Sequence, residues 1–148
     1  MDITELGFLI EQSWSKDTCR AKYKDVWNES NPSLGQSVVT SLAVNDFFGG
    51  EICSCYSTKG AHYYNLIDGK IVDFTHGQFQ GEGILYGMGE EVSRQEILKE
   101  DDNEERYILL LNNIKQEIFS LDKEVDKVLG RKKMNKMVVT DERILKIY

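Results

Sequence analysis

The chain has few of the features that mark secreted or membrane-spanning proteins. Its 148 residues contain three cysteines, an odd number that does not make a disulfide framework. No apolar run approaches the roughly 18 residues that a bilayer span requires, and the acidic first residues lack the positive and apolar regions of a secretory signal. We therefore expect no membrane partner, a cytoplasmic location, and one domain with an appendage.

Histidine is also scarce, which limits metal chemistry. Cys53 and Cys55 lie two apart on an expected strand and share a face, but only His62 and His76 exist to complete a metal site. Two packed or half-buried thiols are the better explanation of the cysteine pair. We expect neither a metal nor a cofactor.

Positive charge is scarce over most of the chain. The net charge of −7 divides into −11 for residues 1–122 and +4 for residues 123–148. An acidic main body is a poor partner for nucleic acid, so we expect no nucleic acid binding. The basic residues 130–136 could touch phosphates, but a solvated linker explains them better.

Proline occurs once, at Pro32, and helical spacing of apolar residues lies on both sides of it. Residues 4–14 predict a first helix capped by Thr4, and residues 36–48 predict a short, largely buried second helix. Residues 90–99 predict a third. Proline forbids a continuous helix through the polar segment between the first two.

Two segments after the second helix read as strands. Residues 51–56 predict one strand, and residues 61–74 predict a hairpin whose turn is Asp68-Gly69, the dipeptide suited to the positive φ angles of a two-residue turn. The fold class is therefore α+β, with N-terminal helices packed on a small antiparallel sheet and a long C-terminal helix. We expect a domain over residues 1–100 and a helical appendage with a short tail over residues 101–148.

The long helix is predicted by a heptad seam within residues 103–129. Its apolar residues recur at alternating spacings of four and three, and they are Tyr107, Leu111, Ile114, Ile118, Leu121, Val125 and Val128. Three heptads make a weak isolated coil, so docking on the domain is favoured over a homodimer through residues 103–129. Two short apolar runs, 137–139 and 144–147, flank a turn-like segment after it.

Three residues in chain order could serve acyl transfer. Ser37 lies where a loop becomes a helix, over free N–H groups and the positive end of the helix dipole, which stabilise a thiolate or an oxyanion. With a two-residue turn in the hairpin, His62 and Asp73 are diagonal neighbours on one face, so Asp73 can hold the imidazole in one tautomer. Asn65 faces the other way.

A simpler interpretation fits the same residues. A histidine near an aspartate on a strand is more often a surface or half-buried polar pair than a catalytic one. A serine after Gly-Gln is usually an N-cap, and the Ser37 hydroxyl could accept from the N–H of residue 39 or 40 with no further role. Geometry alone favours this interpretation.

Several motifs resemble the YunG-like family, in matching order and most densely over residues 10–80. They are Ser13-Trp14-Ser15, Asn31-Pro32, Gly35-Gln36, Val39-Thr40, residues 46–52, His62-Tyr63-Tyr64-Asn65, Asp73-Phe74-Thr75 and Gln78-Phe79. The family is uncharacterised, so the resemblance implies a fold and a site more than an activity. The stretch from His62 to Thr75 also resembles the His-to-Asp strand pair of transglutaminase-like and papain-like enzymes, which implies a core of that type.

The resemblance implies a cysteine after Gly-Gln, whereas this chain has Ser37. A substituted cysteine, a serine nucleophile and an inactive homologue all explain this departure. A hydroxyl has a far higher pKa than a thiol, so Ser37 is a weak nucleophile unless a base is well placed. We therefore expect a thiol-type acyl-transfer enzyme that is inactive or trapped in this form.

The expected enzyme is an amide or ester hydrolase, a deamidase or a transglutaminase-like protein that acts on a peptide or small molecule. Residue 37 attacks, His62 moves the proton and Asp73 orients His62, while Gln36 and backbone N–H groups receive the oxyanion. The cleft would also hold Trp14, Tyr64 and Asn65. The alternatives are a non-catalytic binding module for a peptide or small ligand, which would use Tyr63 with Trp14 and Tyr64, and a regulatory protein that assembles through the heptad helix and basic tail.

Overall fold

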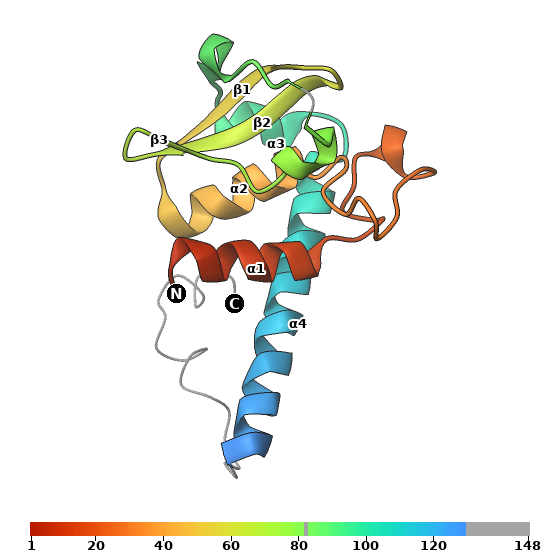
Figure 1. The fold of residues 1–148 in the computed structure, drawn as a ribbon, viewed down its shortest axis with the longest axis vertical. Helices are drawn as coiled ribbons and strands as arrows, with labels where there is room; N and C mark the ends of the chain where they lie inside the picture. The colour runs from red at the N-terminus through yellow and green to blue at the C-terminus, as the bar shows by residue number, and fades with distance from the viewer. Residues whose placement is uncertain (82, 130–148) are drawn as a thin grey trace.

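The computed structural model describes residues 1–81 and 83–129. Within these residues the chain forms four α-helices and a four-stranded antiparallel sheet of order β3-β2-β1-β4, which confirms the α+β class (Figure 1). The expected basic linker and the apolar runs 137–139 and 144–147 lie outside the described residues. The elements are α1 (Ile3–Ser13), α2 (Ser37–Phe48), β1 (Glu51–Ser57), β2 (Gly60–Ile67), β3 (Lys70–Val72), β4 (Glu90–Glu91), α3 (Arg94–Lys99) and α4 (Asn103–Leu129).

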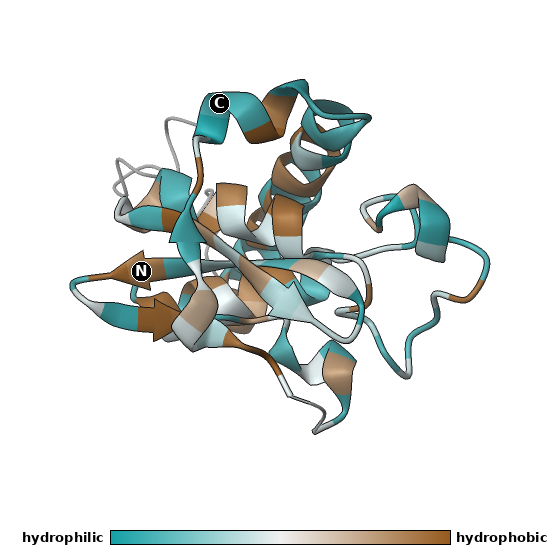
Figure 2. Ribbon diagram, turned by 90° about the horizontal axis from the view of Figure 1, so that it is seen from above, coloured by the Kyte–Doolittle hydropathy of each residue, from teal (hydrophilic) through white to brown (hydrophobic). Residues whose placement is uncertain are grey.

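Two helices, α2 and α1, form successive layers below the sheet (Figure 1). α2 packs against β2, α1 lies beneath α2, and α4 runs alongside both (Figure 1). Because α2 is enclosed on several sides, its side chains are buried nearly all round, as its apolar composition requires. The peripheral connection between α1 and α2 is mostly hydrophilic (Figure 2). The main core joins the three helices and comprises Leu6, Leu9, Ile10, Trp14, Val39, Ala43, Val44, Phe47, Leu110, Ile114 and Ile118.

The helix starts differ from the sequence prediction in two places. The N-cap of α1 is Asp2 rather than Thr4, because Asp2 and Glu5 form a reciprocal capping box with bonds of 2.8 and 2.7 Å. The third helix begins at Arg94 with Ser93 as its N-cap. Glu90–Glu91 pairs with β1 instead, so the predicted helix over residues 90–99 is too long at its start.

The predicted hairpin is confirmed in both turn and register. Asp68 and Gly69 have φ values of 50° and 75°, as a two-residue hairpin turn requires. Asn65 pairs with Val72 across β2 and β3, which is the register that this turn sets. β3 ends at Val72, so Asp73 is the first residue after the strand.

α4 docks on the domain as favoured, but the predicted seam is wrong in its C-terminal part. Leu110, Ile114 and Ile118 are fully buried against α1 and α2, whereas Val125 and Val128 are 38% and 82% exposed. The buried stripe advances by four residues at each step because α4 crosses two other helices, rather than following a parallel partner at 3.5 residues per turn. No helix in the described part of the chain combines the length and apolarity of a bilayer span.

Candidate functional site

Ser37 is the first residue of α2, as predicted, but it is not the N-cap. Gln36 occupies that position and makes no capping bond with its side chain. The Ser37 Oγ accepts a 3.4 Å hydrogen bond from the backbone N–H of Tyr63 on β2. The first hydrogen bond of the helix runs from Thr40 N–H to Gln36 O at 3.0 Å, so the N–H groups before Thr40 precede the helical ladder. The N-cap interpretation of Ser37 is therefore wrong.

Gly35 sets the turn into Ser37, and its replacement should be costly. Its φ is 71°, and a Cβ there would lie 2.7 Å from Cys19 Sγ and 3.0 Å from the Arg20 nitrogen. We expect Gly35→Ala to lower the free energy of unfolding by about 1–3 kcal/mol, measured by urea denaturation. Gly87→Ala is the control, since a Cβ there meets nothing within 4 Å, and an equal loss in both variants would contradict this account.

His62 and Asp73 form a buried polar pair, as the register predicts. The His62 Nε2 lies 2.6 Å from Asp73 Oδ2, and the two side chains are 1% and 5% exposed. Asp73 is held from three further directions. Its Oδ1 accepts from the Thr75 N–H at 3.0 Å and the Thr75 hydroxyl at 3.1 Å, and its Oδ2 accepts from the Tyr86 hydroxyl at 2.5 Å.

These contacts decide the charge of Asp73 and the tautomer of His62. Burial alone would raise the pKa of Asp73, but the hydrogen bonds from His62, Tyr86 and Thr75, with the charge of His62, lower it below its usual value. The carboxylate therefore stays ionised and accepts from Nε2–H. In the neutral imidazole this leaves Nδ1 as the nitrogen that can take a proton.

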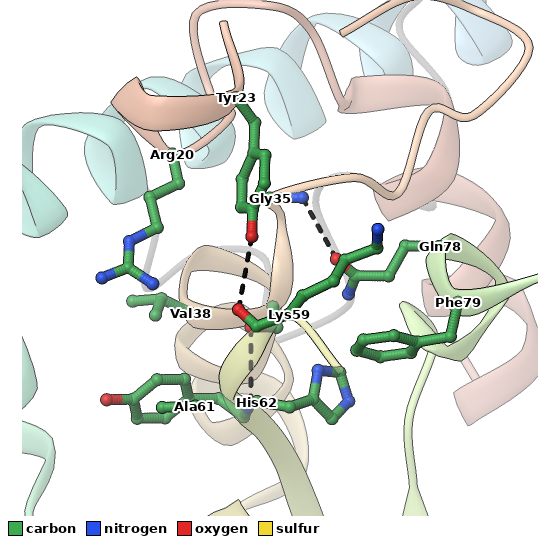
Figure 3. A pocket seen from close by; sticks show the side chains of 11 residues that line it. Arg20, Tyr23, Gly35, Val38, Lys59, Ala61, His62, Gln78 and Phe79 are labelled. Atoms are coloured by element: carbon green, nitrogen blue, oxygen red, sulfur yellow. Dashed lines mark hydrogen bonds between the residues drawn. The ribbon is translucent and has the colours of Figure 1, made fainter. Parts of the chain in front are cut away.

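Ser37 and His62 line the same small cavity, of about 20 Å³ (Figure 3). No hydrogen bond joins them in the described part of the chain, where the Ser37 Oγ accepts from the Tyr63 N–H. The Phe79 ring packs edge-on against His62 with 4.9 Å between centroids. The other lining residues are Arg20, Tyr23, Gly35, Val38, Lys59, Ala61, Tyr63 and Gln78.

Trp14 and Gln36, expected in the cleft, do not line this cavity. Trp14 belongs to the main core and donates its indole N–H to Thr40 Oγ1 at 2.9 Å. Gln36 is fully buried and donates its side-chain amide to Ser15 O at 3.0 Å. The Gln36 amide is therefore engaged by Ser15 O, away from the residues that line the cavity.

Asn65 and Tyr64 also lie outside the cavity. Asn65 faces away from His62, as predicted, and donates to Ser41 O of α2 at 3.0 Å. Tyr64 is buried on the same face of the sheet as His62, two residues further along β2, where its ring lies 5.0 Å from that of Tyr86. Neither side chain lines the cavity beside Ser37.

The three native thiols are poor nucleophiles. Burial raises the pKa of Cys19 to about 11. Cys55, which pairs across the strands with His62, has its pKa raised by burial and by the charge of Asp73, while burial and nearby glutamates raise that of Cys53. Cys53 and Cys55 pack with Tyr64, as the packed-thiol explanation requires. Among the described residues, no three His, Cys, Asp or Glu side chains are grouped so that they could hold a metal ion.

Two residues that sequence reasoning missed support the site. Gln78 accepts from the Gly35 N–H at 3.3 Å and donates to Thr75 O at 3.1 Å, so it ties the turn before Ser37 to the loop after Asp73. Its place in the Gln78-Phe79 motif was a usable signal. Tyr86 binds Asp73 from a glycine-rich segment, where no local pattern indicates the contact.

Comparison with known proteins agrees with the motif resemblance. The sequence model of a family described as YunG protein matches residues 2–119. The Bacillus subtilis (strain 168) protein named "Uncharacterized protein YunG" is 36% identical over 117 residues, which is 79% of this chain and 95% of that protein. No solved structure matches the chain. The chain therefore belongs to the YunG family.

Proposed function

We propose that the chain carries an acyl-transfer site of the thiol-enzyme type, with Ser37 in the nucleophile position. The observation that carries the proposal is the buried His62–Asp73 pair at 2.6 Å, of which His62 lines a cavity together with the first residue of α2. A surface polar pair needs neither this burial nor the further bonds that hold Asp73. A papain-like or transglutaminase-like core is part of the proposal.

The proposed roles follow from the bonding of each group. Nδ1 of His62 takes the proton of the residue 37 nucleophile, while Asp73 accepts from Nε2–H and stabilises the imidazolium that forms. The nucleophile attacks an amide or ester carbonyl, and the N–H groups at the start of α2 receive the oxyanion. The proton returns from Nδ1 to the leaving group, and water or an amine then takes the acyl group from the enzyme. Hydrolysis, deamidation and transamidation share these steps.

A second candidate is a binding module that keeps the cavity without turnover. The observation in its favour is the Ser37 hydroxyl, which contacts the Tyr63 N–H and makes no hydrogen bond to His62 within the described residues. A serine without a bonded base is a weak nucleophile. The two candidates predict different behaviour when a thiol replaces the hydroxyl of residue 37. The acyl-transfer site predicts a thiol with a lowered pKa, and the binding module predicts a thiol that titrates normally.

The Ser37→Cys variant tests the proposal. The rate at which the introduced thiol reacts with iodoacetamide is expected to rise with pH through a pKa well below the free-thiol value of about 8.5. The reason is that the helix N-terminus and a protonated His62 both favour the thiolate. The native thiols have raised pKa values, so they contribute little near neutral pH. The measurement is the pH profile of alkylation, with the modified residue identified by mass spectrometry.

The matched control is His62→Ala in the same background. We expect it to move the titration back towards the free-thiol value, since the positive partner is gone. The rate alone is not decisive, because a lower pKa also reduces the intrinsic nucleophilicity of a thiolate. An introduced thiol that keeps an ordinary pKa with His62 present would contradict the acyl-transfer proposal and favour the binding module.

A further inference from the structure

The charged side chains at the Ser37 cavity are positive, although the molecule is acidic. Figure 3 shows Arg20, from the connection before α2, and Lys59, from the turn between β1 and β2, at the cavity. Among the described residues that line it, none is an aspartate or glutamate. The whole chain carries 25 acidic residues against 18 lysines and arginines, so the local charge is opposite to the net charge.

Neither cation is neutralised by a carboxylate in the described part of the chain. Arg94, another half-buried arginine, forms an ion pair with Asp46 at 2.7 Å, but Arg20 and Lys59 form none. Both are only half-exposed, so part of their hydration is already removed. Such cations raise the local concentration of anions at a cavity.

Hydrogen bonds to the main chain fix the segments that bear both cations. The Arg20 N–H donates to Gly35 O at 2.9 Å, two residues before Ser37. The Tyr23 hydroxyl donates to Lys59 O at 3.3 Å, which ties the turn that bears Lys59 to the same connection. The two side chains therefore start from backbone positions that are fixed relative to the cavity.

The cavity is too small for a whole substrate. Its volume of about 20 Å³ is close to the space that one water-sized group occupies. Only the reacting end of a substrate can enter beside Ser37 and His62. The remainder stays outside the cavity, within reach of Arg20 and Lys59, which line it and are half-exposed.

We propose that the acyl donor carries a carboxylate close to its reacting carbonyl, and that the charges of Arg20 and Lys59, which lie on either side of Tyr23 at the cavity (Figure 3), attract this carboxylate. The inference rests on the proposed acyl-transfer function and adds its substrate class. A guanidinium binds a carboxylate through two parallel hydrogen bonds, and an ammonium adds a point charge. Holding the anion beside the cavity directs the carbonyl towards residue 37.

Two alkylating reagents of similar size test the inference in the Ser37→Cys variant. Iodoacetate is anionic and iodoacetamide is neutral, and both react with the thiolate, so the ratio of their rates does not depend on the thiol pKa. We expect this ratio to be at least about tenfold higher than for N-acetylcysteine amide, a small neutral thiol. Added salt should reduce the difference.

Single charge removals locate the effect. In the Ser37→Cys background, Arg20→Gln and Lys59→Gln should each lower the ratio several-fold, whereas Lys123→Gln, at an exposed position of α4, should leave it unchanged. A ratio equal to that of the small thiol, or one that both cavity variants leave intact, overturns the inference even when the thiol pKa is low. A high ratio with an ordinary thiol pKa overturns the acyl-transfer function and leaves only an anion site.

A binding measurement on the unsubstituted chain keeps the inference testable should Ser37→Cys fail to fold. Glutarate should shift the backbone NMR signals of Gly35, Ser37 and Tyr63, and glutaramide at the same concentration should not. Arg20→Gln should remove the glutarate shifts. Equal shifts with both compounds, or none with either, would overturn the inference.

Discussion

Replacing Asp73 with alanine in the Ser37→Cys background is expected to lower the rate of acyl transfer by about 10³–10⁴-fold with little change in fold. The Asp73 Oδ2 lies 2.6 Å from His62 Nε2 and keeps the proton on that nitrogen, and the charge of the carboxylate stabilises the imidazolium. Without it, His62 is free to present the protonated nitrogen to the nucleophile. The measurement is single-turnover acylation by an activated ester, with the melting temperature determined in parallel.

Asn65→Ala provides the matched control for this prediction. The Asn65 amide donates to Ser41 O at 3.0 Å in a buried position, away from His62. Its removal leaves a buried carbonyl without that bond and should lower the free energy of unfolding by about 1–3 kcal/mol. The acylation rate of the folded protein should fall much less than with Asp73→Ala. Equal or reversed losses of rate, measured at a temperature at which both variants are folded, would show that the third member is assigned to the wrong residue.

The Ile114→Ala variant is expected to lose about 2–5 kcal/mol of unfolding free energy. Ile114 is fully buried in the core that α4 shares with α1 and α2, so truncation removes apolar contacts and leaves a cavity between packed helices. The loss should appear as a lower urea midpoint at an unchanged slope. A loss of this size is a large fraction of the stability of an ordinary domain.

Val128→Ala separates docking from dimerisation. Val128 is 82% exposed, so its truncation should change the free energy of unfolding by less than about 0.5 kcal/mol. In a homodimer through the heptad seam, Val128 would also be buried and the melting temperature would rise with protein concentration. Comparable losses in the two variants together with that concentration dependence would contradict docking as the role of α4.

Local sequence was sufficient for the hairpin and for the polar pair within it. Asp68-Gly69 selects a two-residue turn because both positions need positive φ, and such a turn leaves one register. That register brings His62 and Asp73 to the same face, and the structure has them in contact. The start of α2 at Ser37 was equally local, since helix periodicity begins directly after Gly35-Gln36.

The sequence by itself determined the α+β class, the hairpin and the contact between His62 and Asp73, because these depend on neighbouring residues and on the strand period. Only the tertiary structure decided which face of α4 is buried, since two crossing helices rather than one parallel partner select it. It also decided that Tyr86 binds Asp73 and that Arg20 and Lys59 line one cavity. These contacts join segments far apart in the chain, and neither the local hydrophobic period nor a turn preference specifies a contact between residues so distant in sequence.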